Sequence, residues 1–320
     1  MYPSTFVTHD ERADCLDRWI SESCDIKEVN ISVFAFLTQI GKNKIVIDYV
    51  NDNLTRTIFE NEDFRDLMSD VSQGKVDLNR DDRVEKVLTD IFLEINKQCT
   101  KLNRDGEDGA AIVMTIFIND FFYTVDFGNI IVILGKDIGD PNDLALFPMT
   151  EGQEGLMDKM GFFGCKDQKL RPKVVGSIQM NKSIKFLMFA NASLINLVIA
   201  VKHDDETTGN SYLASILLEK LKNNSDITLQ MEQTLSDIAM TYKSITSDSN
   251  HPGLAMAYLD LSNEIKQDKM EKVETEGLVP SYVDWSDFYN SPNKDEVIVK
   301  IESLRTYYDS KKNLSSIAED

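Results

Sequence analysis

The sequence has little of the chemistry that binds transition metals or forms disulfides. Its 320 residues include 4 cysteines and 3 histidines. They are widely separated and show none of the spacings of zinc or redox sites. The cysteines are Cys15, Cys24, Cys99 and Cys165, and the histidines are His9, His203 and His251. We therefore expect reduced thiols and no transition-metal site.

Basic charge and long apolar runs are also scarce. The chain has 34 Lys and Arg against 54 Asp and Glu, a formal net charge of −20, and such a surface repels phosphate backbones and anionic lipids. No apolar run approaches the roughly 20 residues that span a bilayer, and the first residues lack the basic and apolar regions of a secretory signal. We expect a cytoplasmic protein that binds neither nucleic acid nor membrane.

The fingerprints of common enzyme classes are missing as well. The sequence contains no G-x-S-x-G, no P-loop and no dinucleotide-binding motif. What it does contain is a packed core, because 42% of its residues are hydrophobic and 28% are charged. The length allows one large domain with an appendage, or two small domains.

Hydrophobic periodicity predicts strands and helices in an order typical of antiparallel sheets covered by helices. The expected strands are residues 29–37, 110–118, 121–125, 129–134, 173–178, 184–190 and 254–261. The expected helices are residues 48–58, 62–71, 82–102, 211–221 and 229–245. We predict an α+β fold, with Asn119-Asp120 as a hairpin turn between two of the strands.

The composition changes near residue 265, which indicates a domain boundary. Residues 266–277 are charged and almost free of large apolar groups, and we assign residues 266–279 to a linker. Residues 280–320 follow, with a final amphipathic helix expected over 295–308. We therefore divide the chain into a domain of residues 1–265, a linker and a C-terminal segment.

Five segments resemble, in the same order, the type 2C metal-dependent protein phosphatases. In chain order, the first three are SVFAFLTQIG (32–41), which is similar to FAVYDGHGG in the family; GAAIVMTIFIND (109–120), similar to G-x-TA; and FYTVDFGNIIVIL (122–134), similar to LYVANVGDSRAVL. The last two are KFLMFANASLINLV (185–198), similar to DFLILACDGLWDVL, and GLAMAYLDL (253–261), similar to DNITVMVV. The resemblance covers roughly residues 25 to 262. It implies two packed antiparallel β-sheets flanked by helix pairs.

The resemblance also implies that the catalytic chemistry is missing. Active family members hold two divalent ions through carboxylates, and these ions activate a bridging water. At the matching positions this chain has Leu37 and Thr38 for Asp-Gly, Ala192 for Asp and Gly253 for Asp. The GDSR stretch becomes residues 128–131, GNII. We therefore expect a pseudophosphatase with no metal, no cofactor and no catalytic residue, in which neither Arg12 nor Arg18 stands in a phosphate-binding motif.

Two alternatives keep some phosphatase-like chemistry. Asp126 and the run His203-Asp204-Asp205-Glu206 could form a relocated metal site, although a solvated acidic loop is the simpler interpretation. The protein would then be a weakly active phosphatase. The remnant site could also bind phosphopeptides without cleaving them, although the strongly negative net charge disfavours this.

The segment SYVDWSDFYN (281–290) indicates a partner. On a helix, Tyr282, Trp285, Phe288 and Tyr289 fall within an arc of about 120°. Ser281 is a suitable N-cap, and prolines at 280 and 292 bound the helix. Four large aromatic side chains cannot bury one another in so short an element, so they dock on their own domain or on another protein.

This segment resembles the YVDF-x-x-FY motif of inactive type 2C phosphatase-like adaptors that bind and activate the TGF-β-activated MAP kinase kinase kinase. The resemblance implies that such a kinase binds Tyr282, Val283, Asp284, Trp285, Phe288 and Tyr289. Trp285 replaces a Phe of the motif, and Asn290 replaces an Arg. The function expected from the sequence is that of a catalytically inactive adaptor that promotes kinase activation.

Overall fold

The computed structural model describes most of the predicted domain. The described residues are 2–9, 17–103, 108–128, 130–137, 144–150, 161–166, 170–201, 212–213, 215–217, 219, 226–246 and 253–262. All of them lie in the first of the two units into which the chain divides, Met1–Ile265. The predicted linker and C-terminal segment lie outside them.

Two five-stranded antiparallel sheets form the centre of the described fold. One sheet has the order β1-β10-β9-β6-β7 and the other the order β2-β3-β4-β5-β8. The first contains β1 (Ser4–His9), β6 (Ile130–Asp137), β7 (Leu144–Pro148), β9 (Ile184–Asn191) and β10 (Leu254–Asp260). The second contains β2 (Arg18–Ile26), β3 (Val29–Ile40), β4 (Gly109–Ile118), β5 (Phe121–Phe127) and β8 (Lys173–Gln179).

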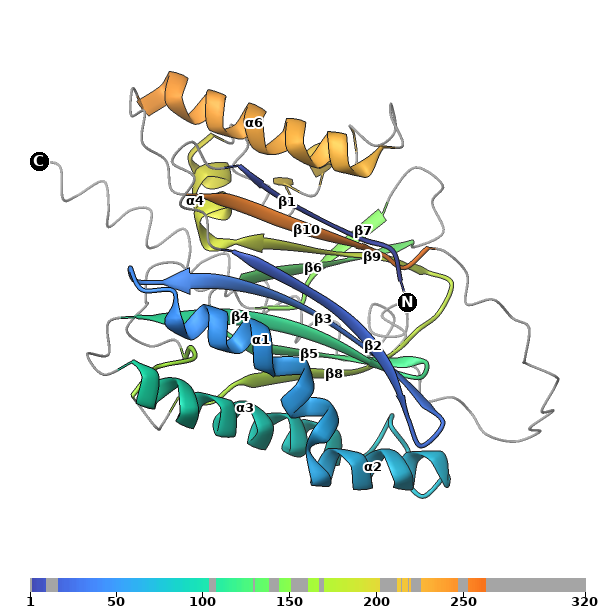
Figure 1. The fold of residues 1–320 in the computed structure, drawn as a ribbon. Helices are drawn as coiled ribbons and strands as arrows, with labels where there is room; N and C mark the ends of the chain where they lie inside the picture. The colour runs from blue at the N-terminus through green and yellow to red at the C-terminus, as the bar shows by residue number, and fades with distance from the viewer. Residues whose placement is uncertain are drawn as a thin grey trace, which may run out of the picture. The chain divides into compact units, whose positions relative to one another are not determined.

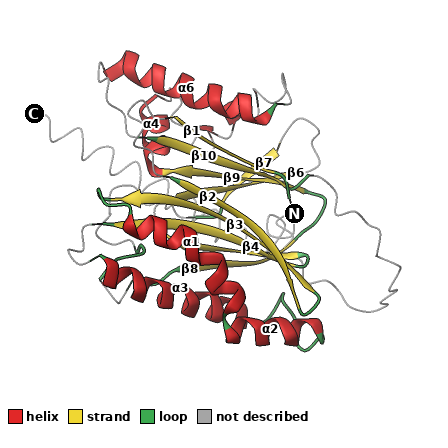
Figure 2. Ribbon diagram, in the orientation of Figure 1, coloured by secondary structure: helices red, strands yellow, loops and turns green. Residues whose placement is uncertain are grey.

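Helices cover the outer face of each sheet, so that four layers result (Figures 1 and 2). The β2–β8 sheet is covered by α1 (Ile45–Glu60), α2 (Glu62–Ser72) and α3 (Arg83–Leu102). The β1–β7 sheet is covered by α4 (Ala192–Val201) and α6 (Ile227–Thr246). This arrangement confirms the predicted α+β sandwich. No helix within the described ranges is long and apolar enough to cross a membrane.

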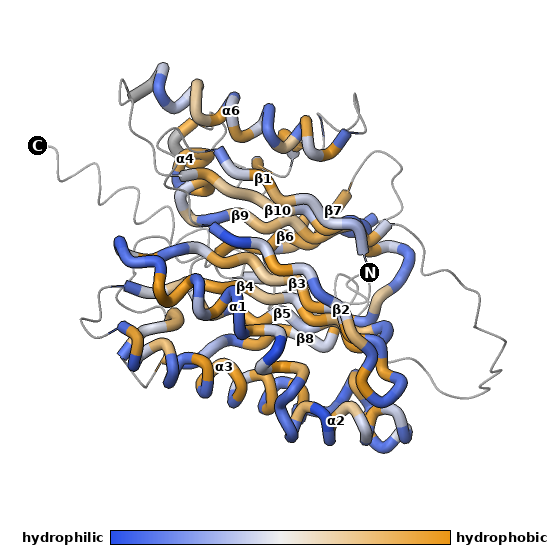
Figure 3. The backbone as a smooth tube through the Cα atoms, viewed as in Figure 1, coloured by the Kyte–Doolittle hydropathy of each residue, from blue (hydrophilic) through white to orange (hydrophobic). Residues whose placement is uncertain are grey.

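Strand alternation divides the buried side chains into three apolar layers. In β3, Phe34 and Phe36 pack between the two sheets, whereas Ala35 and Leu37 pack against the helices α1 to α3. A third layer, which includes Met188, fills the space between the other sheet and its helices. Figure 3 shows hydrophobic residues concentrated along the strands and hydrophilic ones on the outer turns of the helices. Each sheet is therefore apolar on both faces, as expected for a central layer.

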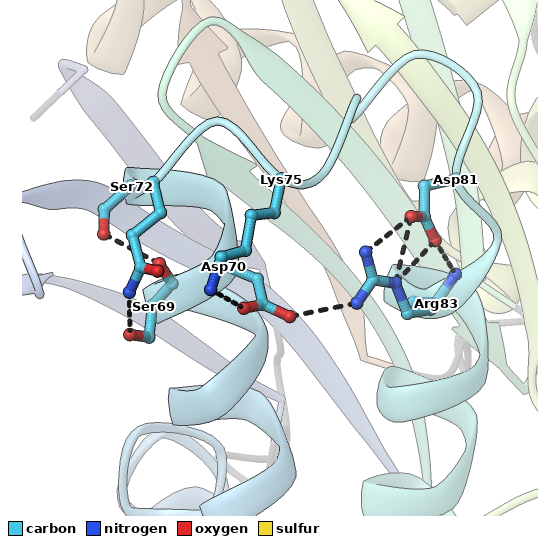
Figure 4. Close-up of polar contacts among 7 residues, drawn as sticks. Ser69, Asp70, Ser72, Lys75, Asp81 and Arg83 are labelled. Carbon is cyan, nitrogen blue, oxygen red and sulfur yellow. Dashed lines mark hydrogen bonds and ion pairs between the residues drawn. The ribbon is translucent and has the colours of Figure 1, made fainter.

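The connection between α2 and α3 is held by ion pairs on the surface (Figure 4). The Nη1 atom of Arg83 lies 3.1 Å from Asp70 Oδ2, and its Nη2 atom lies 2.9 Å from Asp81 Oδ2. Hydrogen bonds from Arg83 hold the pKa of the Asp81 carboxyl below its ordinary value. These groups are partly solvated, so they orient the loop more than they stabilise the fold.

Asn61 ends α1 and caps α2, and its replacement is expected to be measurable. Its Oδ1 accepts a hydrogen bond of 2.9 Å from the backbone N–H of Phe64. Asn61→Ala removes this cap and should lower the free energy of unfolding by about 1 kcal/mol. Urea denaturation measures the change. Asn51→Ala, inside α1, is the matched control and should change stability by less than about 0.5 kcal/mol. Equal effects of the two substitutions would contradict the capping role.

Candidate functional site at one end of the two sheets

The positions that match metal ligands in the type 2C family come together at one end of the sandwich. Leu37 and Thr38 lie near the end of β3, Ala192 is the first residue of α4, and Gly253 immediately precedes β10. Arg18 is the cross-strand partner of Leu37, which places Asp17 at the same end of the neighbouring strand β2. The sequence resemblance therefore selects positions that the fold brings together.

Side-chain direction distinguishes the two positions on β3. Leu37 is completely buried and packs against the helices on the outer side of its sheet. The side chain of Thr38 points the opposite way, toward the other sheet, because successive side chains of a strand alternate between the two faces of its sheet. Its Oγ1 atom is buried and has no hydrogen-bond partner among the described residues. At the end of β3, the matched position that faces the space between the sheets therefore carries a neutral hydroxyl.

Asn191, the last residue of β9, joins the separate parts of this site. Its Nδ2 atom donates to Asp17 Oδ2 at 2.8 Å and to the backbone oxygen of Gly253 at 3.0 Å. Its Oδ1 atom accepts from the backbone N–H of Leu194 at 3.0 Å, inside the first turn of α4. Asn191 and Asp17 are both buried. One carboxamide therefore links β9, the start of β2, the start of β10 and the N-terminus of α4.

Gly128 leaves room for the turn that leads into β6. A Cβ atom at this position would lie 2.4 Å from the Cβ of Ala111, closer than such atoms approach. The next described residue, Ile130, pairs with Asn191 across the sheet. Glycine is thus required for packing here, independently of any role in catalysis. Asn129, which replaces the acid of GDSR, lies outside the described residues.

Arg18 does not present a free guanidinium at this end of the sheets. Its Nη1 atom donates to the backbone oxygen of Asp17 at 3.2 Å. Its Nη2 atom lies 3.5 Å from Asp48 Oδ1 on α1. The Asp48 carboxylate therefore neutralises part of the charge that this guanidinium could offer to a phosphate.

The described residues at this site do not fit a centre of two divalent ions. Hard cations require several oxygen ligands, most of them carboxylates. Leu37 and Ala192 supply hydrocarbon, and Thr38 supplies one neutral oxygen. Among the described residues, Asp17 Oδ2 and the backbone oxygen of Gly253 accept hydrogen bonds from Asn191. Within the described ranges, no three His, Cys, Asp or Glu side chains gather closely enough to hold a metal ion.

Known structures share this arrangement of sheets and helices. The serine/threonine phosphatase 2C of Toxoplasma gondii matches with a TM-score of 0.54 and 12% identity, over 81% of this chain and 100% of that chain. The serine/threonine phosphatase Stp1 of Staphylococcus aureus matches with a TM-score of 0.52 and 13% identity, over 81% and 95%. The fold is that of the type 2C phosphatases.

A third structure with this fold is described as a sex-determining protein and not as a phosphatase. A sex-determining protein of C. elegans matches with a TM-score of 0.50 and 12% identity, over 81% of this chain and 65% of that one. No family model and no curated protein sequence matches the chain. At these identities, the likeness to the type 2C phosphatases is one of fold.

The other predicted site residues are only partly described. Asp126 lies in β5 opposite Val113 and Lys173. The acidic run 203–206 lies outside the described residues, and so do the six residues of the predicted kinase-binding motif. Sequence reasoning missed Asp17 and Asn191. A polar residue closing an apolar strand was the available signal for Asn191, whereas nothing in the sequence around Asp17 marks it as buried.

Proposed function

We propose that this protein is a catalytically inactive phosphatase-like adaptor that binds a MAP kinase kinase kinase of the TGF-β-activated type and promotes its activation. The observation that carries the proposal is the makeup of the site. Leu37, Ala192 and Gly253 stand at the positions that match metal-binding carboxylates, and the Asn191 carboxamide donates hydrogen bonds to Asp17 Oδ2 and to the Gly253 carbonyl. The proposal places the protein in the cytoplasm with its kinase partner.

Loss of catalysis follows from the requirements of metal-assisted phosphate hydrolysis. The two ions lower the pKa of a bridging water and neutralise the charge that develops on the phosphoryl oxygens. Neither task can be taken over by hydrocarbon side chains or by a neutral carboxamide. Arg18, paired with Asp48, does not replace the missing positive charge. What this chain retains of a phosphatase is therefore its shape.

The adaptor role is supported by the segment 281–290 that follows the linker. Its predicted aromatic face resembles the motif by which inactive phosphatase-like adaptors bind their kinase. A helix of this kind docks in an apolar groove, with aromatic anchors supplying most of the binding energy. Activation requires that the segment bind the active kinase conformation more tightly than the inactive one, since only differential affinity shifts an equilibrium.

A two-part assay on the full chain tests the proposal. Hydrolysis of a phosphopeptide in the presence of Mn²⁺ is expected to equal that of buffer, and a chelator should change nothing. An active type 2C phosphatase, measured alongside, should lose its activity in the chelator. The chain should also increase autophosphorylation of the isolated kinase catalytic domain.

The contrary outcomes separate the competing functions. Turnover that depends on Mn²⁺ and disappears with the chelator would identify a weakly active phosphatase. Saturable binding of a phosphopeptide without turnover, measured by isothermal titration calorimetry, would identify a phosphopeptide-binding protein. An unchanged kinase activity at saturating concentrations of the chain would reject the adaptor role.

A further inference from the structure

The amide group of Asn191 is oriented unambiguously by its three partners. A backbone N–H can only donate, so the side-chain atom that faces Leu194 must be the oxygen. The Nδ2 group then faces the carboxylate of Asp17 and the carbonyl of Gly253, both of which can only accept when Asp17 is ionised. The NH₂ group therefore stands as a positively polarised centre between two buried oxygens.

A bound cation would be surrounded by oxygens in the same way as the NH₂ group of Asn191. Buried oxygens that converge on one point repel each other unless a positive group lies between them. Divalent ions serve this purpose in the active type 2C phosphatases. Of the matching positions, Ala192 follows Asn191 in the chain, and Gly253 itself supplies one of its acceptors. Here both donors of one carboxamide are used, and the buried Asp17 Oδ2 is satisfied without an ion.

We propose that the Asn191 carboxamide takes the structural place of a cation and ties the ends of the two sheets together, so that the domain folds independently of divalent ions. The tie crosses from one sheet to the other, because Asn191 ends β9 and Asp17 adjoins β2. The same side chain caps α4 through Leu194. This inference concerns folding, and it stands whether or not the chain binds a kinase.

Asn191→Asp isolates the role of the NH₂ group. Aspartate is as good an N-cap as asparagine, so the hydrogen bond from Leu194 is kept. The second carboxylate oxygen would instead face Asp17 and the Gly253 carbonyl, which is repulsive in a buried setting. In a chelator, the melting temperature of this variant should fall by about 5 °C or more relative to the unchanged chain. Millimolar Mn²⁺ should restore most of that loss, because the substitution creates a pair of facing carboxylates.

Two further melts complete the experiment on the full chain. The unchanged protein should melt at the same temperature, within about 1 °C, in chelator, Mg²⁺ and Mn²⁺. Asn191→Leu keeps the branched shape and the number of side-chain heavy atoms but has no polar atoms, so it should lose stability without any recovery in Mn²⁺. If this variant does not fold, isothermal titration of Mn²⁺ into Asn191→Asp and the unchanged chain supplies the comparison, with heat of binding expected only for Asn191→Asp.

Several results would overturn the inference. A rise of several degrees when Mn²⁺ or Mg²⁺ is added to the unchanged chain would show that the domain still uses a cation. If the Asn191→Asp variant melts at the same temperature as the unchanged chain in chelator, the NH₂ group of Asn191 does not stabilise the contact between the two sheets. Failure of Mn²⁺ to rescue Asn191→Asp would show that the amide does not occupy a cation's place. None of these results bears on kinase binding, which the autophosphorylation assay measures separately.

Discussion

Trp285→Ala is expected to weaken binding of the full chain to the kinase catalytic domain by about 2 kcal/mol or more, roughly 30-fold in the dissociation constant. The proposed helix places Trp285 between Phe288 and Tyr289 on its aromatic face. An indole buried in a groove supplies a large apolar area, and its N–H requires a partner there. Phe288→Ala should have an effect of similar size. Surface plasmon resonance with the immobilised kinase domain measures both.

Asp287→Ala is the matched control for these variants. On a helix of residues 281–290, Asp287 points away from the aromatic face, so its loss should change the affinity less than about 3-fold. A thermal melt of each variant checks that the rest of the chain still folds. Equal weakening by Asp287→Ala and Trp285→Ala would indicate a general charge effect, and no weakening by Trp285→Ala or Phe288→Ala would rule out this docking mode.

Binding and activation can be separated with the same variants. If the segment acts by population shift, a weaker binder should still activate the kinase when its concentration is raised above the new dissociation constant. The maximal activity should then be unchanged, and only the concentration needed should increase. A lower maximum would mean that Trp285 also contributes to the preference for the active kinase conformation.

Elements with strong periodicity were predicted well from the sequence. The helix predicted at residues 82–102 is α3, Arg83–Leu102, and the hairpin turn at Asn119-Asp120 joins β4 and β5 as expected. In α3 the buried residues recur at helical spacing, so the pattern has one interpretation. The strand predicted at residues 29–37 is longer, because Thr38, Gln39 and Ile40 continue to pair with β4. The local amino-acid composition does not predict pairing with a strand that is distant in the sequence.

Other elements were not predicted because their sequences are polar or ambiguous. The strand β2, Arg18–Ile26, lies at a sheet edge and has the largely polar sequence RWISESCDI. The strands β1 and β7 are also edge strands and are short. The helix α4, Ala192–Val201, is apolar except for Ser193 and Asn196, so its periodicity is weak. Tertiary contacts determine the conformation of such segments.

The candidate site could be predicted only in part, for a related reason. The replacement of carboxylates by Leu37, Ala192 and Gly253 can be predicted from the sequence once its segments are matched to the type 2C phosphatase motifs. The carboxamide bridge is not, because Asp17 and Asn191 are 174 residues apart. Their contact depends on how the start of β2 lies against the end of β9. A single sequence gives no measure of that distance.

The same limit applies to the core, and it leads to the prediction with the largest effect. The sequence does not tell which apolar residues of β9 face the other sheet and which face the helices. In the structure, Phe189 packs between the sheets and is completely buried. Its ring centroid lies 5.2 Å from that of Trp19, in an edge-to-face arrangement. Its cross-strand neighbours are Val132 and Ala257, so neither of the two side chains directly beside it is large enough to fill its place.

Phe189→Ala is therefore expected to lower the free energy of unfolding by about 4 kcal/mol, measured by urea denaturation. The loss combines the transfer energy of the ring with the cavity left between two rigid sheets. Phe189→Leu, which leaves a smaller void, should cost about 1.5 kcal/mol. Met240→Ala, on α6 with 60% of the residue exposed, should change stability by less than about 0.5 kcal/mol. If Phe189→Ala costs no more than Met240→Ala, the two sheets do not pack face to face around this ring.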